Sequence, residues 1–350
     1  MRKKLYVGLT LLAVAAFFVI IVPNLPSNDE QKNSTSDSAY PNRNLQGTIV
    51  WAAGGACDTL SRSIVPYVQE SLGQAIIMNN VSGASGVIGT NLVEGQPCDG
   101  YNILFGAETT QIYPALGISD LSYNDFEPIA LFAGCNPIVL VDKNSPFNTI
   151  EELINHIDEN PGKVTMGTTG AGGTPYVFGA VLNQMTGGEV NSIPYDGDGP
   201  AKTALLGGHI DFTVVTYIGC KSLIESGDVK ALAVLNSVPQ EGLDAPVITD
   251  SYPAYNNFVS LQPFYGAFVK KGTPQNVLDT LSTSFQAAMQ TEKYAEFLDS
   301  VGAIGLNLTG DEAKRFLEDY EKTCSWVFYD SGMTTINPAD LGIERPAEDV

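Results

Sequence analysis

The run of small residues at positions 52–56 constrains this chain more than any other feature of its sequence. An apolar, strand-like run (Thr48 to Trp51) leads into it, and Asp58 opens an amphipathic helical pattern behind it. Because the loop has almost no side chains, its backbone N–H groups can approach a ligand closely. The N-terminus of the helix behind it adds partial positive charge. We therefore expect a strand–turn–helix unit that binds an anion without Arg or Lys.

A second loop of the same kind extends from Gly167 to Thr174. It follows a strand-like run at 163–166 and precedes a helix-like run at 176–185. The loop lacks the Lys-Ser/Thr ending of a phosphate-binding P-loop, and neither loop fits the dinucleotide fingerprint. Two such loops predict two α/β lobes that face one cleft.

The chain is acidic, with 39 Asp and Glu against 18 Lys and Arg in 350 residues and a formal net charge of −21. This length allows two lobes of ordinary domain size. The charge argues against nucleic acid as a partner, because neutralising phosphates needs clustered Lys and Arg. We interpret the acidity as a solvated surface rather than as a cation-binding role.

The sequence contains no pattern typical of a metal, cofactor or catalytic site. Its five cysteines are widely spaced and include no C-x-x-C pair, which argues against zinc or redox chemistry. Outside the cell one or two disulfides could form, but the spacing does not define the pairs. His156 and His209 have no second ligand at metal spacing. A Gly-x-Ser-x-Gly elbow is also absent, so we expect no metal, no cofactor and no enzyme activity.

The N-terminus has the charge order of a targeting segment. Arg2, Lys3 and Lys4 precede an apolar run at 5–22, and a polar tract follows to about residue 44. The apolar run is longer than the usual signal-peptide core of about 7–15 residues, and it approaches the roughly 20 residues that span a bilayer. We therefore interpret residues 1–44 as a signal peptide or a membrane anchor plus a flexible tether. Both alternatives place the body outside the cytoplasm, either in the periplasm or at the outer face of the membrane.

From Gly47 onward, strand-like and helix-like segments alternate, which is typical of a mostly parallel α/β sheet. The alternation restarts at 143–149 and lapses at 250–262. We interpret these places as two crossings between lobes, which together make a hinge. The predicted lobe 1 comprises residues 45–142 and 263–350, and lobe 2 comprises residues 143–262.

Several short motifs follow one another between Gly47 and Gly332. They lie at residues 52–62, 83–89, 99–104, 145–154, 160–163, 193–197 and 205–211. Each is weak alone, but their number and order leave little room for chance. In these motifs the chain resembles the extracytoplasmic solute receptors of tripartite tricarboxylate transporters, which are also called Bug proteins.

The resemblance implies a type II periplasmic-binding-protein fold, with two α/β lobes and a two-crossing hinge, that closes on a small organic carboxylate. It implies a monomer that delivers its ligand to the large and small integral membrane subunits of the transporter. Thr168 and Thr169 stand where the family usually has Ser-Ser, and either hydroxyl can donate to an oxyanion. Asp58 would cap the helix and orient waters. The implied ligand-binding residues are Ala53, Gly54, Gly55, Ala56, Cys57, Asp58, Thr109, Thr168, Thr169, Gly170, Ala171, Gly172, Gly173 and Tyr195.

The chain departs from the family pattern at three positions. Asp196 replaces a common Lys, Tyr176 replaces a His, and Glu108 lies where small hydroxyl residues are usual. The two acids disfavour a polyanion such as citrate and favour a ligand with one carboxylate, with or without an amino group for Asp196 or Glu108. Two other functions stay open: a receptor that presents its carboxylate-bound form to a membrane sensor kinase, and an enzyme on an α/β scaffold.

Overall fold

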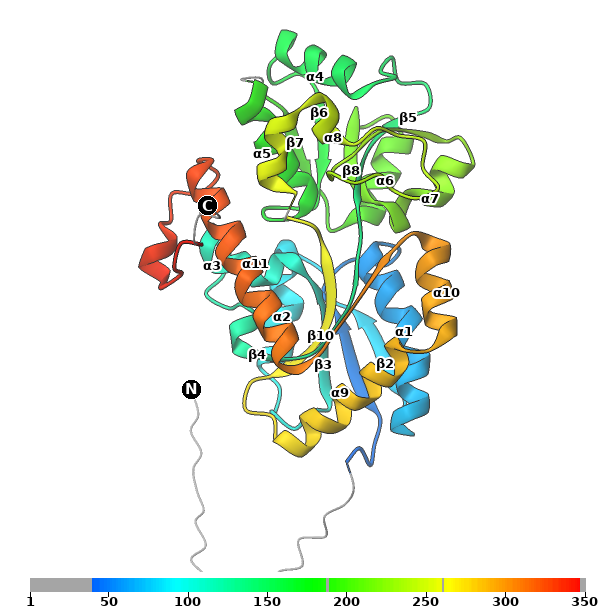
Figure 1. The fold of residues 1–350 in the computed structure, drawn as a ribbon, viewed down its shortest axis with the longest axis vertical. Coiled ribbons are helices and arrows are strands. Elements are labelled where there is room, and N and C mark those ends of the chain that lie inside the picture. The colour runs from blue at the N-terminus through cyan, green and yellow to red at the C-terminus, as the bar shows by residue number, and fades with distance from the viewer. Residues whose placement is uncertain (1–39, 187–188, 260, 347–350) are drawn as a thin grey trace, which may run out of the picture. The chain divides into compact units, whose positions relative to one another are not determined.

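The computed structural model describes residues 40–186, 189–259 and 261–346 of the chain. The predicted N-terminal segment therefore lies almost entirely outside the described residues. Two sheets, each with helices on both faces, form two lobes (Figure 1). Within the described part, no helix is both long enough and apolar enough to cross a membrane.

The first lobe is built on a six-stranded sheet. Three neighbouring strands pair in parallel, and every other pairing in this sheet is antiparallel. In spatial order the strands are β11 (Ile304–Leu308), β4 (Phe126–Gly134), β10 (Phe264–Lys270), β3 (Asn102–Ala107), β1 (Leu45–Ile49) and β2 (Ile76–Asn80).

The second lobe repeats this arrangement with five strands. Three of them pair in parallel, and two pair antiparallel. In spatial order they are β7 (Asn191–Pro194), β6 (Thr165–Thr168), β8 (Phe212–Thr216), β5 (Pro137–Asp142) and β9 (Val229–Val234).

Helices cover both faces of the first sheet (Figure 1). On one face α1, α9 and α10 pack their apolar sides against the strands, and on the other face α2 and α11 do so. The bounds are α1 (Ala56–Leu72), α2 (Val87–Glu94), α9 (Gln275–Met289), α10 (Glu292–Val301) and α11 (Gly310–Asp330), with the short α3 (Tyr113–Leu116) near α11.

The second sheet is covered in the same way. Apolar residues of α4 and α5 pack on one face, and those of α6 and α7 pack on the other. The bounds are α4 (Ile150–Glu159), α5 (Thr174–Thr186), α6 (Asp198–Leu206), α7 (Tyr217–Glu225) and the short α8 (Ile248–Ser251). The 3₁₀ turns are residues 84–86, 108–112, 123–125, 253–258 and 338–341.

The prediction of mostly parallel sheets is wrong. Only β1 with β2 and β3, and β6 with β7 and β8, pair in parallel. In each sheet the strand that leads into or out of the neighbouring lobe, β5 or β10, runs antiparallel to both of its partners. A chain that crosses from the other lobe enters the sheet at the end where the parallel strands finish, so it has to run in the opposite direction.

Sheet membership also moves the first crossing. β4 belongs to the first sheet and β5 to the second, so the chain crosses at Cys135 and Asn136, earlier than the predicted boundary after residue 142. The turn residues Gly134, Asn136 and Pro137 mark a break between the two strands, but they do not show that the next strand joins another sheet. β10 returns to the first sheet at Phe264. The other lobe limits remain a prediction.

All five cysteines lie in the described part, and each is a free thiol. Four of them are buried among apolar side chains, and Cys98 is exposed. Burial raises the pKa of Cys57, Cys135, Cys220 and Cys324 above the usual thiol range. These thiols are therefore protonated and unreactive at neutral pH.

Candidate functional site

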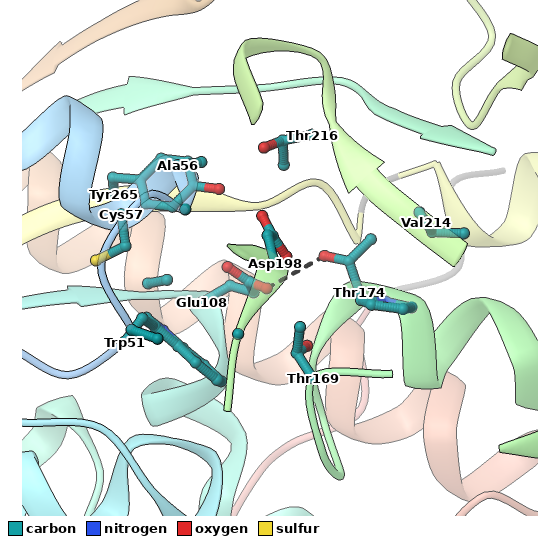
Figure 2. Close-up of a pocket in the computed structure, with 15 residues that line it drawn as sticks. Trp51, Ala56, Cys57, Glu108, Thr169, Thr174, Asp198, Val214, Thr216 and Tyr265 are labelled. Carbon is teal, nitrogen blue, oxygen red and sulfur yellow. Dashed lines mark hydrogen bonds between the residues drawn. The ribbon is translucent and has the colours of Figure 1, made fainter. Parts of the chain in front are cut away.

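A cavity lies between the two lobes, beside the carboxyl ends of parallel strands from both sheets (Figure 2). It encloses about 480 Å³, including the part that opens to solvent. Ligands of open α/β sheets bind at this end of the strands. The lining residues are Trp51, Ala52, Gly55, Ala56, Cys57, Ala107, Glu108, Thr169, Thr174, Pro175, Gly197, Asp198, Val214, Thr216 and Tyr265.

The first predicted loop forms a tight turn between β1 and α1. Gly54 has φ +82°, a conformation that favours glycine. Helix α1 begins at Ala56, two residues earlier than predicted, behind the N-cap Gly55. Its first intrahelical bond joins the Thr59 N–H to the Gly55 carbonyl oxygen at 3.0 Å. The N–H groups of Ala56, Cys57 and Asp58 therefore have no acceptor within the helix.

Asp58 binds its own loop. Its Oδ2 accepts from the Gly54 N–H at 3.0 Å, and its Oδ1 accepts from Arg62 Nε at 2.7 Å and Asn80 Nδ2 at 3.0 Å. Burial opposes ionisation, but the hydrogen bonds from Gly54, Asn80 and Arg62 outweigh it and lower the pKa of Asp58. The Gly54 N–H is thus engaged inside the protein, so the prediction that it faces a ligand is not met in this structure.

The second predicted loop joins β6 to α5, and two of its residues, Thr169 and Thr174, line the cavity. Thr169 is 7% exposed. Its side chain packs against Gly173, where a Cβ would collide with the Thr169 hydroxyl. The carbonyl oxygen of Thr168 accepts from the Tyr195 N–H at 2.7 Å. Thr168 is also buried and does not reach the cavity.

Other predicted residues form the contact between the lobes around the cavity. A Cβ on Gly170 would lie 2.5 Å from Ser85 Oγ, and one on Gly172 would lie 2.8 Å from Leu116 Cδ1. Thr109 Oγ1 approaches the Gly172 carbonyl oxygen at 3.5 Å. These glycines let the two backbones approach closely.

The structure therefore brings four of the predicted residues to the cavity: Gly55, Ala56, Cys57 and Thr169. The other ten are not among the lining residues: Ala53, Gly54, Asp58, Thr109, Thr168, Gly170, Ala171, Gly172, Gly173 and Tyr195. Tyr195 instead packs beside the apolar cluster under α6. Asp196 is exposed, and its carbonyl oxygen accepts from the Ala52 N–H at 3.3 Å.

Sequence reasoning omitted the strand-end residues from its list of ligand contacts. Trp51 follows β1, Glu108 follows β3 and Thr216 ends β8, and all three line the cavity. Their position at the carboxyl ends of parallel strands was the signal that could have found them. Asp198 lies in the first turn of α6, and the sequence around it does not indicate that its side chain reaches the cavity.

Two carboxyl groups dominate the electrostatics of the cavity, Glu108 from the first lobe and Asp198 from the second (Figure 2). Burial raises the pKa of Glu108 to about 7, and the charge of Asp198 contributes to this rise. Burial also raises the pKa of Asp198 to about 6, against the opposing effects of Lys202 and of a hydrogen bond from the Ala56 backbone N–H. Both groups therefore change their charge near neutral pH.

The described residues contain no group of three or more His, Cys, Asp or Glu side chains placed to bind a metal ion. The two acids of the cavity instead lie among hydroxyl groups, main-chain amides and apolar side chains. Such a site is suited to hydrogen bonding with a small polar molecule.

Two α/β lobes joined by two chain crossings, with a cavity between them that holds two carboxyl groups, define a solute-binding protein with the periplasmic-binding-protein fold. The chain belongs to the family described as "Tripartite tricarboxylate transporter family receptor", whose model matches residues 60–329.

Relatives and solved structures agree with this assignment. Protein BugT of Bordetella pertussis is 29% identical over 304 residues, covering 85% of this chain and 92% of that protein. The periplasmic binding protein BugD has a similar structure, with a TM-score of 0.79 and 29% identity over 84% of this chain and 99% of that one. The structure of R. palustris Rpa4515 with adipate has a TM-score of 0.77 and 25% identity, covering 84% and 98% of the two chains.

Proposed function

We propose that this protein is an extracytoplasmic receptor that binds a small organic carboxylate between its lobes and delivers it, chemically unchanged, to a tripartite transporter in the membrane. One observation carries the proposal. The turn before α1 and the turn before α5 come from different lobes, and both contribute to one cavity at helix N-termini.

The proposed contacts follow from the unpaired donors of these turns. The Cys57 N–H has no acceptor within α1 and belongs to a residue that lines the cavity. The Thr169 hydroxyl lies on the opposite lobe. A ligand carboxylate can accept from both and can gain further stabilisation from the positive ends of the two helices.

The location and the partners are inferred from relatives. BugD is described as a periplasmic binding protein, and Rpa4515 is described with adipate. We extend the periplasmic location and the carboxylate class to this chain. The large and small membrane subunits of the transporter are its proposed partners.

The test is a thermal-shift screen of mono- and dicarboxylates against the purified full-length chain. A ligand that binds only the folded state raises the melting temperature. Positive compounds are then offered to membrane vesicles that contain the transporter subunits, with and without this receptor. A carboxylate that shifts the melting temperature and enters the vesicles only with the receptor supports the proposal. If no carboxylate changes the melting temperature, the proposal is wrong.

A further inference from the structure

The cavity carries negative charge and no fixed cation. Glu108 and Asp198 are the charged groups among its lining residues, which include no Lys, Arg or His. The Nζ atom of the nearby Lys202 donates to the carbonyl oxygens of Gly219 at 2.6 Å and Gly54 at 3.3 Å. Lys202 is therefore already engaged at the rim, and the space between the two acids lacks a positive group from the described residues.

Glu108 has hydrogen-bonding capacity that the protein does not use. It is 7% exposed, and its Oε1 accepts from the Thr174 hydroxyl at 3.2 Å (Figure 2). Its Oε2 is buried and has no hydrogen-bond partner among the described residues. The Thr216 hydroxyl, 5% exposed at the same cavity, is also unpartnered. Buried polar atoms without partners are costly and rare, so this pair marks the place where a ligand supplies the missing bonds.

Asp198 faces the same space from the other lobe. Its carboxylate accepts from the Ala56 backbone N–H at the start of α1. It thus occupies part of the amide site that the sequence assigns to a ligand carboxylate. Two carboxylates in one buried space repel each other, and each opposes the ionisation of the other. A cation between them removes that repulsion.

We propose that the ligand carries a protonated amine in addition to its carboxylate, and that Glu108 and Asp198 bind this amine between the lobes. The inference rests on the proposed function and narrows the ligand to amino-carboxylates. An ammonium group has three donors and no acceptor. It can therefore satisfy Glu108 Oε2, Asp198 and the Thr216 oxygen together, while the Cys57 N–H and the Thr169 hydroxyl remain for the ligand carboxylate.

A second arrangement of the same groups predicts different ligands. If Glu108 were protonated, it could donate a hydrogen bond to a second ligand carboxylate, and the site would then prefer dicarboxylates without an amine. Such binding would strengthen as the pH falls from 8 to 5, because only the protonated form of Glu108 can donate. The two arrangements are therefore separable by ligand choice and by pH.

The test compares carboxylates that differ only by an amino group. Isothermal titration calorimetry of the full-length chain at pH 8 uses three pairs: propionate and alanine, succinate and aspartate, adipate and 2-aminoadipate. We expect the amine-bearing member of at least one pair to bind roughly ten- to hundredfold more tightly than its partner. Equal or tighter binding by the amine-free members overturns this inference and leaves the proposed function standing. Failure of all six compounds to bind overturns this inference, and the proposed function fails with it only if no carboxylate of the thermal-shift screen binds.

Isosteric variants assign the selectivity to the two acids. Glu108→Gln and Asp198→Asn keep the shape of each side chain and remove its charge, and Glu296→Gln removes an exposed charge on α10 as a matched control. We expect each cavity variant to lower the preference for the amine-bearing ligand by about tenfold, with the control unchanged. Thermal melts verify that the variants are folded. A preference that survives both cavity substitutions, or amine-free binding that tightens at pH 5, contradicts the inference.

Discussion

Glu108 shows how one side chain can be poorly placed for stability and well placed for binding. Its neighbours satisfy one carboxylate oxygen and leave the other without a partner. Burial raises its pKa to about 7, so the folded protein binds this proton more tightly than the unfolded chain does. For an acid with a raised pKa, stability is lost as the pH rises from the unfolded pKa through the folded one.

The direction of this pH dependence leads to a prediction for Glu108→Gln, whose side chain cannot ionise. Between pH 5 and pH 8 the wild-type protein loses stability through Glu108, whereas the variant does not. We expect the free energy of unfolding of the variant, relative to wild type, to rise by about 2 kcal/mol over this interval. Urea unfolding of the ligand-free proteins at both pH values measures it. Asp198 titrates in both proteins but loses its repulsion from Glu108 in the variant, so the difference reports Glu108 together with this interaction. An equal difference at both pH values would contradict the pKa assignment.

Gly55 offers a direct test of the first turn. Its φ of −87° and ψ of 176° suit any residue, and a Cβ there would lie 3.7 Å from its nearest neighbours, Ala52 O and Asp198 Cβ. Gly55→Glu therefore adds a carboxylate at the start of α1 without straining the backbone. We expect it to weaken carboxylate binding by at least about tenfold through like-charge repulsion, while Gly55→Ala stays close to wild type. Calorimetry with a carboxylate from the screen distinguishes them, and normal binding by Gly55→Glu would show that the turn is not the site.

At the scale of the element, the start of α1 depends on Asp58. Its side chain holds the Gly54 amide, Arg62 and Asn80, and so connects the turn to the helix and to β2. An acid in the first turn is also stabilised by the helix dipole. The small residues of the loop provide no such bonds themselves, so a side chain from the helix fixes their geometry.

Asp58→Ala should destabilise the protein by about 1–2 kcal/mol, because it leaves the Gly54 and Asn80 donors without their acceptor. Arg62→Ala is the control, since it removes the exposed member of the ion pair and should cost less than about 1 kcal/mol. Urea unfolding near pH 7 gives both values. If the two variants lose the same stability, the ion pair and not the capping of the turn stabilises this element.

The elements differ in how far the sequence predicts them. Continuous apolar runs such as β5 and β8, and amphipathic patterns such as α4, are signals contained within one short segment of the sequence. β11 has a weak local signal, because it is a short edge strand with a register shift, in which Asn307 has φ +55°. The crossing was placed too late because the turn residues between β4 and β5 show only that one strand ends and another begins. Both strands are apolar, so nothing local shows that β5 joins the other sheet.

The candidate site, like the fold, could be predicted where its signal is local but not where it depends on contacts between distant segments. Strand–turn–helix patterns located both turns, because small residues before a helix are a local signal. Which amides remain free for a ligand depends on Asp58 and Asp198, which compete for them from within α1 and from the other lobe. Such competition arises only when distant segments meet, so no local pattern could reveal it.

At the scale of the whole described body, we expect ligand binding to depend on the contact between the lobes. The lobes meet through main-chain and small-residue contacts, including Ala52 with Asp196 and Gly172 with Leu116 and Thr109. The cavity lies between the surfaces that these contacts hold together. A ligand that bridges both lobes therefore favours the conformation in which they touch, and anything that separates them lowers its affinity.

Gly172→Asn tests this coupling without altering a residue that lines the cavity. Gly172 has φ +81°, which Asn tolerates better than most residues, but its side chain would enter the space of Leu116 Cδ1 and Thr109 Cγ2 on the opposite lobe. We expect carboxylate affinity to fall by about tenfold, with the scattering-derived radius of gyration of the ligand-bound sample larger than in wild type.

Gly208→Asn is the matched control for Gly172→Asn. It lies in the same lobe with φ +67°, and a Cβ there meets nothing within 4 Å, so it carries the same backbone cost without entering the lobe contact. If both variants bind more weakly than wild type by the same factor, backbone strain at the substituted glycine explains the loss without the lobe contact. A large difference between them would show that the ligand is held by two surfaces that must meet, because Gly172 can reach the ligand only through the contact between the lobes.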